Sequence, residues 1–357
     1  MTRLHLVNGF LGSGKTTAIV QAAREHMARG ERVGVVTNDQ GRFLVDTAFV
    51  RAQQIPVVQV TGGCFCCSFD QLLDVLTDLN DDARPDVIYA ESVGSCADLV
   101  ATVVLPLRAK PELSVTCESL SVFADSRLLL RLFRGEPLPF SDSVLYIMES
   151  QLEEAGTLVL NKIDLLDDAA VKELLAFSEE RLPGRPVLAQ NSLDQRHVLR
   201  WIEMIDSGGA QAPRFPARVD YDRYGEGETQ LAWVDRALSA EDLGIGGRMQ
   251  VIAMVREIAQ ALAEHRVPVA HVKFHVSCPG ASAKISLTTL SQTGWESEIP
   301  DVAGAVELLV NARVQAESER AGDWIDAALE RACVQSGGGW RVVTADTLTP
   351  QAPRRPY

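Results

Sequence analysis

The sequence lacks the features of several protein classes. No apolar run approaches the roughly 18 residues that suggest a membrane-spanning helix, and no signal-peptide pattern precedes the strand-like segment that begins at Leu4. The net charge is −14, with 34 basic residues against 48 acidic ones, which disfavours nucleic acid or an anionic membrane as a partner. These absences predict a cytoplasmic protein that binds neither nucleic acid nor a membrane.

Cysteine is sparse, and its count is odd. Seven cysteines in 357 residues do not resemble the even-numbered disulfide framework of small secreted proteins. Three of them lie within residues 64–67, which indicates metal or redox chemistry. We interpret the isolated ones as small buried residues. They are Cys96, Cys117, Cys278 and Cys333.

The length suits two domains, and in the first of them strands and helices are expected to alternate. Strand-like and helix-like segments alternate over residues 1–206, which predicts a doubly wound α/β fold with a mostly parallel sheet. The predicted helices include Thr16 to about Arg29, Phe69–Leu79 and Ala169–Arg181. The predicted strands are Leu4–Val7, Arg32–Thr37, Val57–Val60, Val87–Ala90, Leu120–Ala124, Thr157–Leu160 and Pro186–Ala189.

The pattern changes after residue 206. Residues 207–216 are rich in glycine, proline and small side chains and are the expected linker. Residues 217–348 mix strands with amphipathic helices, which predicts a smaller α+β domain. Residues 349–357 are expected to be a disordered tail. The predicted elements are Gln230–Ala237, Arg248–His265, Ala270–Cys278, Lys284–Leu290, Val306–Val314, Asp323–Cys333 and Trp340–Ala345.

Residues 9–17 read Gly-Phe-Leu-Gly-Ser-Gly-Lys-Thr-Thr and match the phosphate-binding loop G-x-x-x-x-G-K-[ST]. Glycines leave the backbone N–H groups free to surround a β-phosphate, and the dipole of the following helix adds to the positive field. We expect Lys15 to bridge the β- and γ-phosphates and the Thr16 hydroxyl to bind Mg²⁺. The expected nucleotide-binding residues of this loop are Gly9, Gly12, Ser13, Gly14, Lys15, Thr16 and Thr17.

Residues 161–164, Asn-Lys-Ile-Asp, follow another apolar strand and match the pattern N-K-x-D. The carboxylate of Asp164 is expected to accept two N–H bonds from the guanine edge, while the stem of Lys162 covers the base. Adenine would leave that carboxylate unpaired, and hydrogen bonds to a charged group are worth about 1.5–3 kcal/mol each. Asn161, Lys162 and Asp164 therefore predict specificity for GTP.

Magnesium and the γ-phosphate need an acid at the end of a strand beside the phosphate loop. Glu91 ends an apolar strand, and Gly94 follows where a backbone N–H can sense the γ-phosphate. Residues 38–46 come after the second predicted strand, where a switch loop is expected. The alternative for Asp39 and Asp46 in that segment is a solvated loop acid.

Residues 63–67, Gly-Cys-Phe-Cys-Cys, lie between the switch segment and the strand of Glu91, just before a predicted helix. A helix N-terminus lowers the pKa of a thiol from about 8.5 and favours the metal-binding thiolate. Adjacent cysteines are too close for ordinary disulfide geometry. Three thiolates leave the fourth tetrahedral position open, which suits a carrier that must release its ion. The alternative is three small buried residues.

Together these segments resemble the CobW-type metal-chaperone GTPases, which are relatives of the UreG and HypB nickel-insertion GTPases. The resemblance covers about residues 3–200. It rests on the phosphate loop, the switch segment, TGGCFCCS at 61–68, ESVG at 91–94 and QLEEAGTLVLNKIDLL at 151–166. The family's switch segment typically begins Asn-Glu-Phe-Gly-Glu, whereas this chain has Asn38-Asp39-Gln40-Gly41-Arg42.

The resemblance also implies roles for single residues. Asp46 and Glu91 match the acids linked to Mg²⁺, which with Lys15 makes three expected catalytic residues. The expected Mg²⁺ ligands are Thr16, Asp46 and Glu91. The expected ligands of a transition metal are Cys64, Cys66 and Cys67.

The function implied is a GTPase that couples Mg-GTP binding and hydrolysis to the delivery of Zn²⁺, Co²⁺ or another thiophilic ion. The recipient is a client metalloenzyme or a protein of the cobalamin pathway, and a nucleotide-dependent homodimer is expected by analogy. Two alternatives stay open. One is a GTPase chaperone of a B12-dependent or nitrile-hydratase-like enzyme, and the other is a non-catalytic GTP-binding protein that buffers metal or senses redox state through its thiols.

Overall fold

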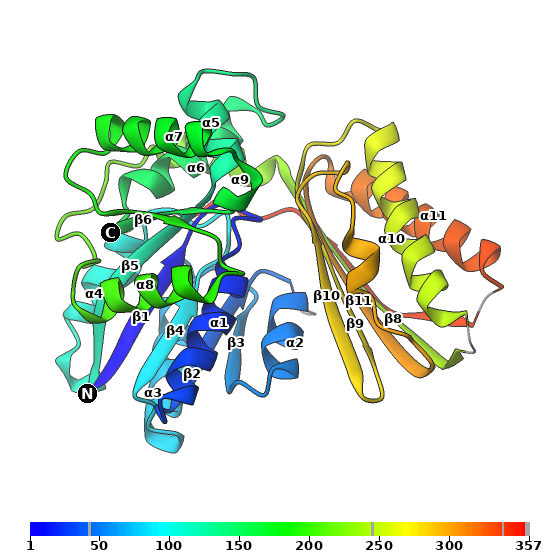
Figure 1. Ribbon diagram of the computed structural model, residues 1–357, viewed down its shortest axis with the longest axis horizontal. Helices are drawn as coiled ribbons and strands as arrows, with labels where there is room; N and C mark the ends of the chain where they lie inside the picture. Colours follow the sequence, from blue (N-terminus) through cyan, green and yellow to red (C-terminus); the bar gives the residue numbers. More distant parts are fainter. Residues whose placement is uncertain (42–43, 244–245, 338, 354–357) are drawn as a thin grey trace. The chain divides into compact units, whose positions relative to one another are not determined.

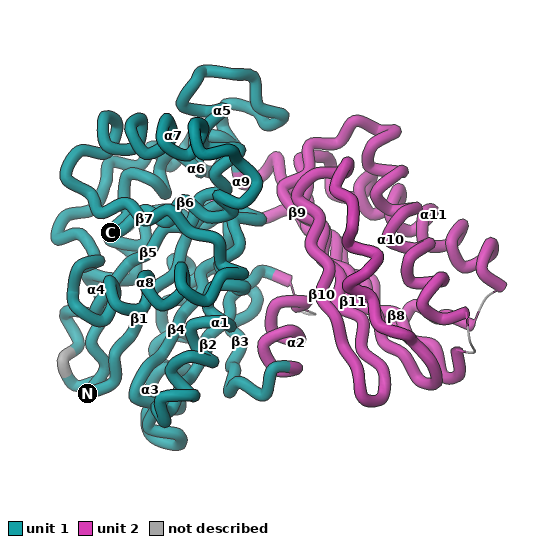
Figure 2. Tube along the Cα trace, in the orientation of Figure 1, with its two compact units in different colours: residues 1–40, 53–227, 353–357 teal, residues 41–52, 228–352 magenta. Residues whose placement is uncertain are grey.

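The computed structural model describes residues 1–41, 44–243, 246–337 and 339–353, which form two compact units (Figure 1 and Figure 2). Unit 1 contains residues 1–40 and 53–227, and unit 2 contains residues 41–52 and 228–352. No helix within the described ranges is both long and apolar enough to cross a membrane. Residues 349–353 form neither helix nor strand, and the rest of the predicted tail lies outside the described residues.

Unit 1 is built on a parallel sheet, for which the described residues supply seven strands in the order β3-β2-β4-β1-β5-β6-β7. Central strands such as β4 are buried along their whole length, which explains their continuous apolar sequence. The predicted doubly wound α/β fold is confirmed. The strands are β1 (Thr2–Asn8), β2 (Val33–Asp39), β3 (Val57–Thr61), β4 (Val87–Glu91), β5 (Val115–Asp125), β6 (Thr157–Asn161) and β7 (Val187–Gln190).

Helices connect these strands. Figure 1 shows α1 and α8 side by side against the sheet, and the two helices contact each other. The last helix, α9, begins after the expected linker, yet its Tyr224 packs with Ala97 and Ile147 inside unit 1. The expected linker therefore lies within this unit. The helices are α1 (Lys15–Ala28), α3 (Phe69–Asp82), α4 (Leu105–Arg108), α5 (Ser126–Phe133), α6 (Asp142–Glu153), α7 (Asp168–Arg181), α8 (Gln195–Asp206) and α9 (Tyr221–Thr229).

Unit 2 is an antiparallel sheet, with five strands among the residues described, in the order β10-β9-β11-β8-β12. Helices α10 and α11 contact each other and pack on the sheet, so the predicted smaller α+β domain is confirmed. The strands are β8 (Leu231–Leu243), β9 (Val269–Cys278), β10 (Ala281–Leu287), β11 (Gly304–Gln315) and β12 (Trp340–Leu348). The helices are α2 (Val45–Ala52), α10 (Gly247–Glu264) and α11 (Ser318–Gln335).

The two faces of this second sheet differ in polarity. Alternate residues of a strand point to opposite faces. On β9, Val272, Phe274 and Val276 enter the apolar core that includes α10 and α11. Lys273 between them points to the other face, where α2 contacts β9, β10 and β11. The end of the predicted switch segment therefore packs on the polar face of unit 2.

Candidate nucleotide and metal site

The phosphate loop passes so close to its neighbours that two of its glycines have no room for a side chain. Gly9 has φ +132°, and a Cβ there would lie 2.0 Å from the carbonyl oxygen of Phe123. Gly14 has φ +92°, and its Cβ would lie 2.4 Å from Nδ2 of Asn161. Positive φ combined with this crowding requires glycine. The loop is thus held against β5 and against the predicted base-recognition motif.

The structure brings Lys15, Thr16 and Glu91 together at the carboxyl edge of the sheet. Lys15 donates from Nζ to the carbonyl oxygen of Gly9 at 2.7 Å. Thr16 donates from Oγ1 to Oε1 of Glu91 at 2.9 Å, and all three side chains are buried. The pairing of β1 with β4 explains why these side chains lie together, because Glu91 at the end of β4 is opposite Val7 of β1, just before the phosphate loop. A hydroxyl and a carboxylate oxygen are the hard ligands that Mg²⁺ takes.

Asn161 joins three loops at this edge. It donates from Nδ2 to the carbonyl oxygen of Ser13 at 2.8 Å. Its Oδ1 accepts from the backbone N–H of Ser192 at 3.1 Å and from the Ser192 hydroxyl at 2.8 Å. Ser192 was missed in the sequence, although it lies just after the carboxyl end of β7, the strand next to β6, which ends at Asn161. This position alone could have identified it.

Lys162 is fixed by an acid that the sequence analysis also missed. It has φ +63°, and its Nζ lies 2.9 Å from Oδ2 of Asp125 at the end of β5. Burial acts to raise the pKa of Asp125, but hydrogen bonds from Arg127 and the charge of Lys162 outweigh it and lower the pKa to about 2. Asp164 is exposed, where its carboxylate can meet a base edge.

The loop after Glu91 rests on buried polar groups. Gln151 donates from Nε2 to the carbonyl oxygens of Gly94 at 3.1 Å and Cys96 at 2.9 Å. Behind the loop, Asn8 donates to Glu154 at 2.8 Å. Burial raises the pKa of Glu154 to about 8, so this carboxyl holds a proton near neutral pH. The position of Gly94 is thus set by contacts from α6.

The cysteine loop is attached to the end of β2 through Asn38. This residue donates from Nδ2 to the carbonyl oxygens of Val60 at 3.2 Å and Gly63 at 2.7 Å, and its Oδ1 accepts from the N–H of Phe65 at 2.9 Å. The loop then turns into α3 by hydrogen bonds from the N–H groups of Cys67 and Ser68 to the carbonyl oxygen of Cys64.

The three predicted thiols converge. Their sulfur atoms all lie within 4.8 Å of one another. Cys64 and Cys66 form a disulfide bond in the structure, and Sγ of Cys66 lies 3.9 Å from Sγ of Cys67. The disulfide joins cysteines two positions apart, with Phe65 between them, and not the adjacent pair that geometry disfavours. Cys96 is buried, as predicted, and it contacts this group through Cys66. The same prediction is wrong for Cys117, Cys278 and Cys333, which are only half-buried.

Asp46 belongs to unit 2, where two lysines hold it. Its Oδ2 lies 2.5 Å from Nζ of Lys273, and its Oδ1 lies 2.8 Å from Nζ of Lys284. Burial acts to raise the pKa of Asp46, but the two ammonium charges hold it well below its usual range. Its predicted Mg²⁺ role stays a prediction. Arg42, where the charge differs from the family pattern, lies outside the described residues.

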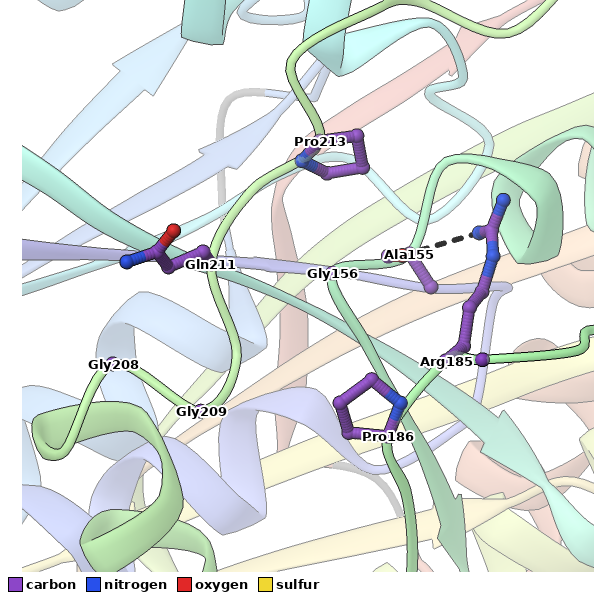
Figure 3. A pocket seen from close by; sticks show the side chains of 9 residues that line it. Ala155, Gly156, Arg185, Pro186, Gly208, Gly209, Gln211 and Pro213 are labelled. Atoms are coloured by element: carbon purple, nitrogen blue, oxygen red, sulfur yellow. Dashed lines mark hydrogen bonds between the residues drawn. The ribbon is translucent and has the colours of Figure 1, made fainter.

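A cavity of about 370 Å³ lies at the other edge of the first sheet (Figure 3). Gly156 and Pro186, which line it, precede β6 and β7, whereas the phosphate loop follows the carboxyl end of β1. Arg185 points to the peptide backbone there and donates to the carbonyl oxygens of Leu152 and Ala155. Ligands of parallel α/β sheets bind outside the carboxyl ends of the strands, so this cavity is not the nucleotide site.

Comparison with known proteins agrees with these features. Residues 3–188 match the family described as CobW/HypB/UreG, nucleotide-binding domain. A zinc chaperone CobW of Sinorhizobium sp. is 28% identical over 206 residues, which are 52% of this chain and 57% of that protein. The zinc chaperone YeiR of Escherichia coli K12 is 35% identical over 95 residues, 26% of this chain and 29% of that protein. The chain thus matches less than two thirds of the length of each.

Two solved structures resemble the chain weakly. A Zn(II)-bound YjiA GTPase from Escherichia coli is 14% identical with a TM-score of 0.39, covering 93% of this chain and 98% of that one. HypB from Helicobacter pylori in complex with nickel is 16% identical with a TM-score of 0.43, covering 60% and 92%.

Proposed function

This chain belongs to the CobW/HypB/UreG family, and from that premise we propose that it is a GTP-hydrolysing metallochaperone that loads and releases Zn²⁺. The observation that carries the proposal is that the nucleotide residues and the cysteine loop share the carboxyl edge of the unit 1 sheet. Glu91 and Asn161 end strands of one parallel sheet, and the phosphate loop and the cysteine loop follow the carboxyl ends of two others. A change around the nucleotide can therefore reach the thiols through a few residues of chain.

GTP is held by two sets of residues in this proposal. The backbone of residues 9–17 surrounds the phosphates, and Lys15 moves from the Gly9 carbonyl to the β- and γ-phosphates. Asp164 reads the guanine edge, while Asn161 keeps its loop against Ser13. Thr16 and Glu91 fit Mg²⁺, because both are buried oxygen donors already 2.9 Å apart. The ion supplies positive charge against the phosphates.

Zinc is the cargo, and the cysteine loop is its carrier. Thiolates are preferred ligands of zinc, and the relatives CobW and YeiR are named zinc chaperones. Asn38, the first residue of the switch segment, ties the cysteine loop to the end of β2, so that ordering this segment around GTP moves the loop. A client metalloenzyme receives the ion, and a pair of chains facing through their nucleotide sites is the proposed assembly.

The test is a zinc titration against a competing chelator, under reducing conditions, in the apo, GDP and GTP-analogue states. We expect affinities that differ about tenfold between the nucleotide states, which is about 1.4 kcal/mol of coupling. The double variant Cys66→Ser/Cys67→Ser should lose tight zinc binding, whereas the control Cys333→Ser on α11 should keep it.

Two outcomes would overturn the proposal. Equal zinc affinities in all three states would leave a GTP-binding protein that buffers metal or senses redox state. Equal binding of ATP and GTP in competition would remove the guanine assignment of Asp164. By linkage, zinc must also change GTP affinity by the factor by which GTP changes zinc affinity, which checks the titration internally.

A further inference from the structure

Cys96 lies far from the cysteine loop in the sequence but beside it in unit 1. Its side chain is fully buried, and its Sγ lies 3.2 Å from Sγ of Cys66. It lies in the loop that follows Glu91, and its backbone is hydrogen-bonded on both sides. Its N–H donates to the carbonyl oxygen of Val93 at 2.9 Å, and its carbonyl oxygen accepts from Gln151.

We propose that Cys96 is the fourth thiolate ligand of the metal carried by Cys64, Cys66 and Cys67. The inference rests on the proposed function, because it completes the same site. Four ligands at about 2.3 Å in a tetrahedron place their sulfur atoms about 3.8 Å apart. The contacts of Cys66, 3.2 Å to Cys96 and 3.9 Å to Cys67, lie around this separation. The group of sulfur atoms that all lie within 4.8 Å of one another contains Cys64, Cys66 and Cys67 without Cys96, so Cys96 must come closer to the rest of the group when the ion binds. Three ligands come from one loop, and the fourth comes from the nucleotide-sensing loop.

The redox state of the loop decides whether the ligands are available. Cys64 and Cys66 form a disulfide bond in the structure, and a disulfide sulfur is not a thiolate. A dithiol reductant returns two electrons and two protons to the pair and becomes a disulfide itself. Each reduced thiol then loses its proton as the ion binds.

The position of Cys96 gives the metal a direct link to the nucleotide. One residue separates it from Gly94, the predicted sensor of the γ-phosphate, and Gln151 binds the carbonyl oxygens of both. A movement of the loop after Glu91 therefore moves one ligand and leaves the other three in place. When Cys96 withdraws, its bond to zinc breaks and its sulfur takes up a proton, so a closed four-thiolate site becomes an open three-thiolate site. A ligand of the client protein then forms the new bond at the open position.

The experiment compares wild type, Cys96→Ser and the control Cys117→Ser, each reduced and loaded with one equivalent of Zn²⁺ or Co²⁺ in the GTP-analogue state. X-ray absorption of the zinc protein should count four sulfur neighbours at about 2.3 Å in wild type and three with one lighter neighbour in Cys96→Ser. The thiolate-to-cobalt charge-transfer band should lose about a quarter of its intensity. Zinc affinity should fall at least about tenfold in Cys96→Ser and stay unchanged in Cys117→Ser.

The outcomes separate this inference from the proposed function. Three sulfur neighbours in wild type, or equal zinc affinities in wild type and Cys96→Ser, overturn the role of Cys96 and leave the metallochaperone in place. No zinc binding by reduced wild type overturns both. The sulfur count in wild type needs no variant, so it decides the question even if Cys96→Ser fails to fold. GTP binding by Cys96→Ser reports that its unit 1 is intact.

Discussion

Two polar regions of the molecule are built on opposite principles. At the carboxyl edge of the unit 1 sheet, polar side chains bond mostly to backbone carbonyls and N–H groups, as Lys15 does to Gly9 and Asn38 does to Gly63. On the polar face of the unit 2 sheet, charged side chains bond to each other. Arg313 lies 2.6 Å from Asp235 there, and Asp46 is shared by two lysines.

The difference teaches which region is prepared for a ligand. When a lysine moves from a backbone carbonyl to a phosphate, the carbonyl loses one hydrogen bond. The free-energy cost of such an exchange in the first region is therefore small. A buried ion pair that loses one partner leaves an uncompensated charge. The edge of unit 1 is therefore suited to exchange its bonds for those of a nucleotide, whereas the face of unit 2 is suited to hold α2.

The largest expected effect comes from removing the lysine of the first region. Lys15→Ala should weaken GTP binding by about 100-fold or more, because charge-assisted bonds to two phosphates are lost at about 1.5–3 kcal/mol each. Lys273→Ala should leave GTP affinity unchanged, because its ammonium group is already bonded to Asp46. Calorimetric titration with a GTP analogue measures both. Equal losses in the two variants would remove the distinction between the two regions.

The second prediction concerns a buried acid in unit 1 that is protonated instead of paired. Burial raises the pKa of Glu154 from about 4.5 to about 8. Between those values the unfolded chain releases this proton while the folded chain keeps it. The contribution to stability is therefore complete below about pH 4.5 and is lost as the pH rises toward 8, at up to about 1.4 kcal/mol per pH unit.

Glu154→Gln removes this titration and keeps a neutral group that can bond Asn8. The free energy of unfolding of the variant, relative to wild type, should rise steadily from pH 5 to pH 8 in urea titrations. Glu153→Gln is the control, because its side chain is exposed. A difference between Glu154→Gln and wild type that does not change with pH would contradict the protonated state.

Much of the candidate site in unit 1 could be predicted because its residues belong to short sequence motifs. The phosphate loop and N-K-x-D each follow an apolar strand, and parallel strands bring their carboxyl ends to one edge. Lys15, Thr16 and Glu91 meet in the structure as that rule requires. Unit 2 was predicted only as a mixture of strands and helices, since alternating polarity gives strand faces but not what packs on them.

The residues that were missed are those whose partners lie far away in the sequence. Cys96 looks like an isolated cysteine, because the 30 residues to Cys66 contain α3 and β4. Asp125 and Ser192 carry no motif of their own and gain their roles from Lys162 and Asn161. The lysines that hold Asp46 are more than 200 residues away, at sequence separations of 227 and 238. Tertiary contacts of this kind leave no local pattern.

The smallest effect is expected from the acid of the second region. Asp46→Asn should lower the free energy of unfolding of unit 2 by about 1–2 kcal/mol, because two largely buried ammonium groups lose their shared counter-ion and repel each other. The charges of the lysines keep the pKa of Asp46 well below its usual range, against the effect of burial. Its contribution is present above the unfolded pKa of about 3.9 and is lost only as the pH falls through the lowered folded pKa. The loss in Asp46→Asn should therefore be the same at pH 5 and pH 8, unlike the effect of Glu154→Gln.

Two comparisons make the result for Asp46 decisive. Asp86→Asn removes one partner of the exposed pair with Arg32 and should change stability by no measurable amount. Adding Lys273→Met to Asp46→Asn should restore part of the lost stability, because the repulsion between the two ammonium groups disappears, and the double-mutant cycle measures that coupling. An Asp46→Asn variant of unchanged stability that still binds GTP but no longer hydrolyses it would instead favour the Mg²⁺ role that the sequence predicts. Asp46 would then exchange its ion pairs with the two lysines for Mg²⁺. The contrast between a region that exchanges its bonds and one that keeps them would not hold for Asp46.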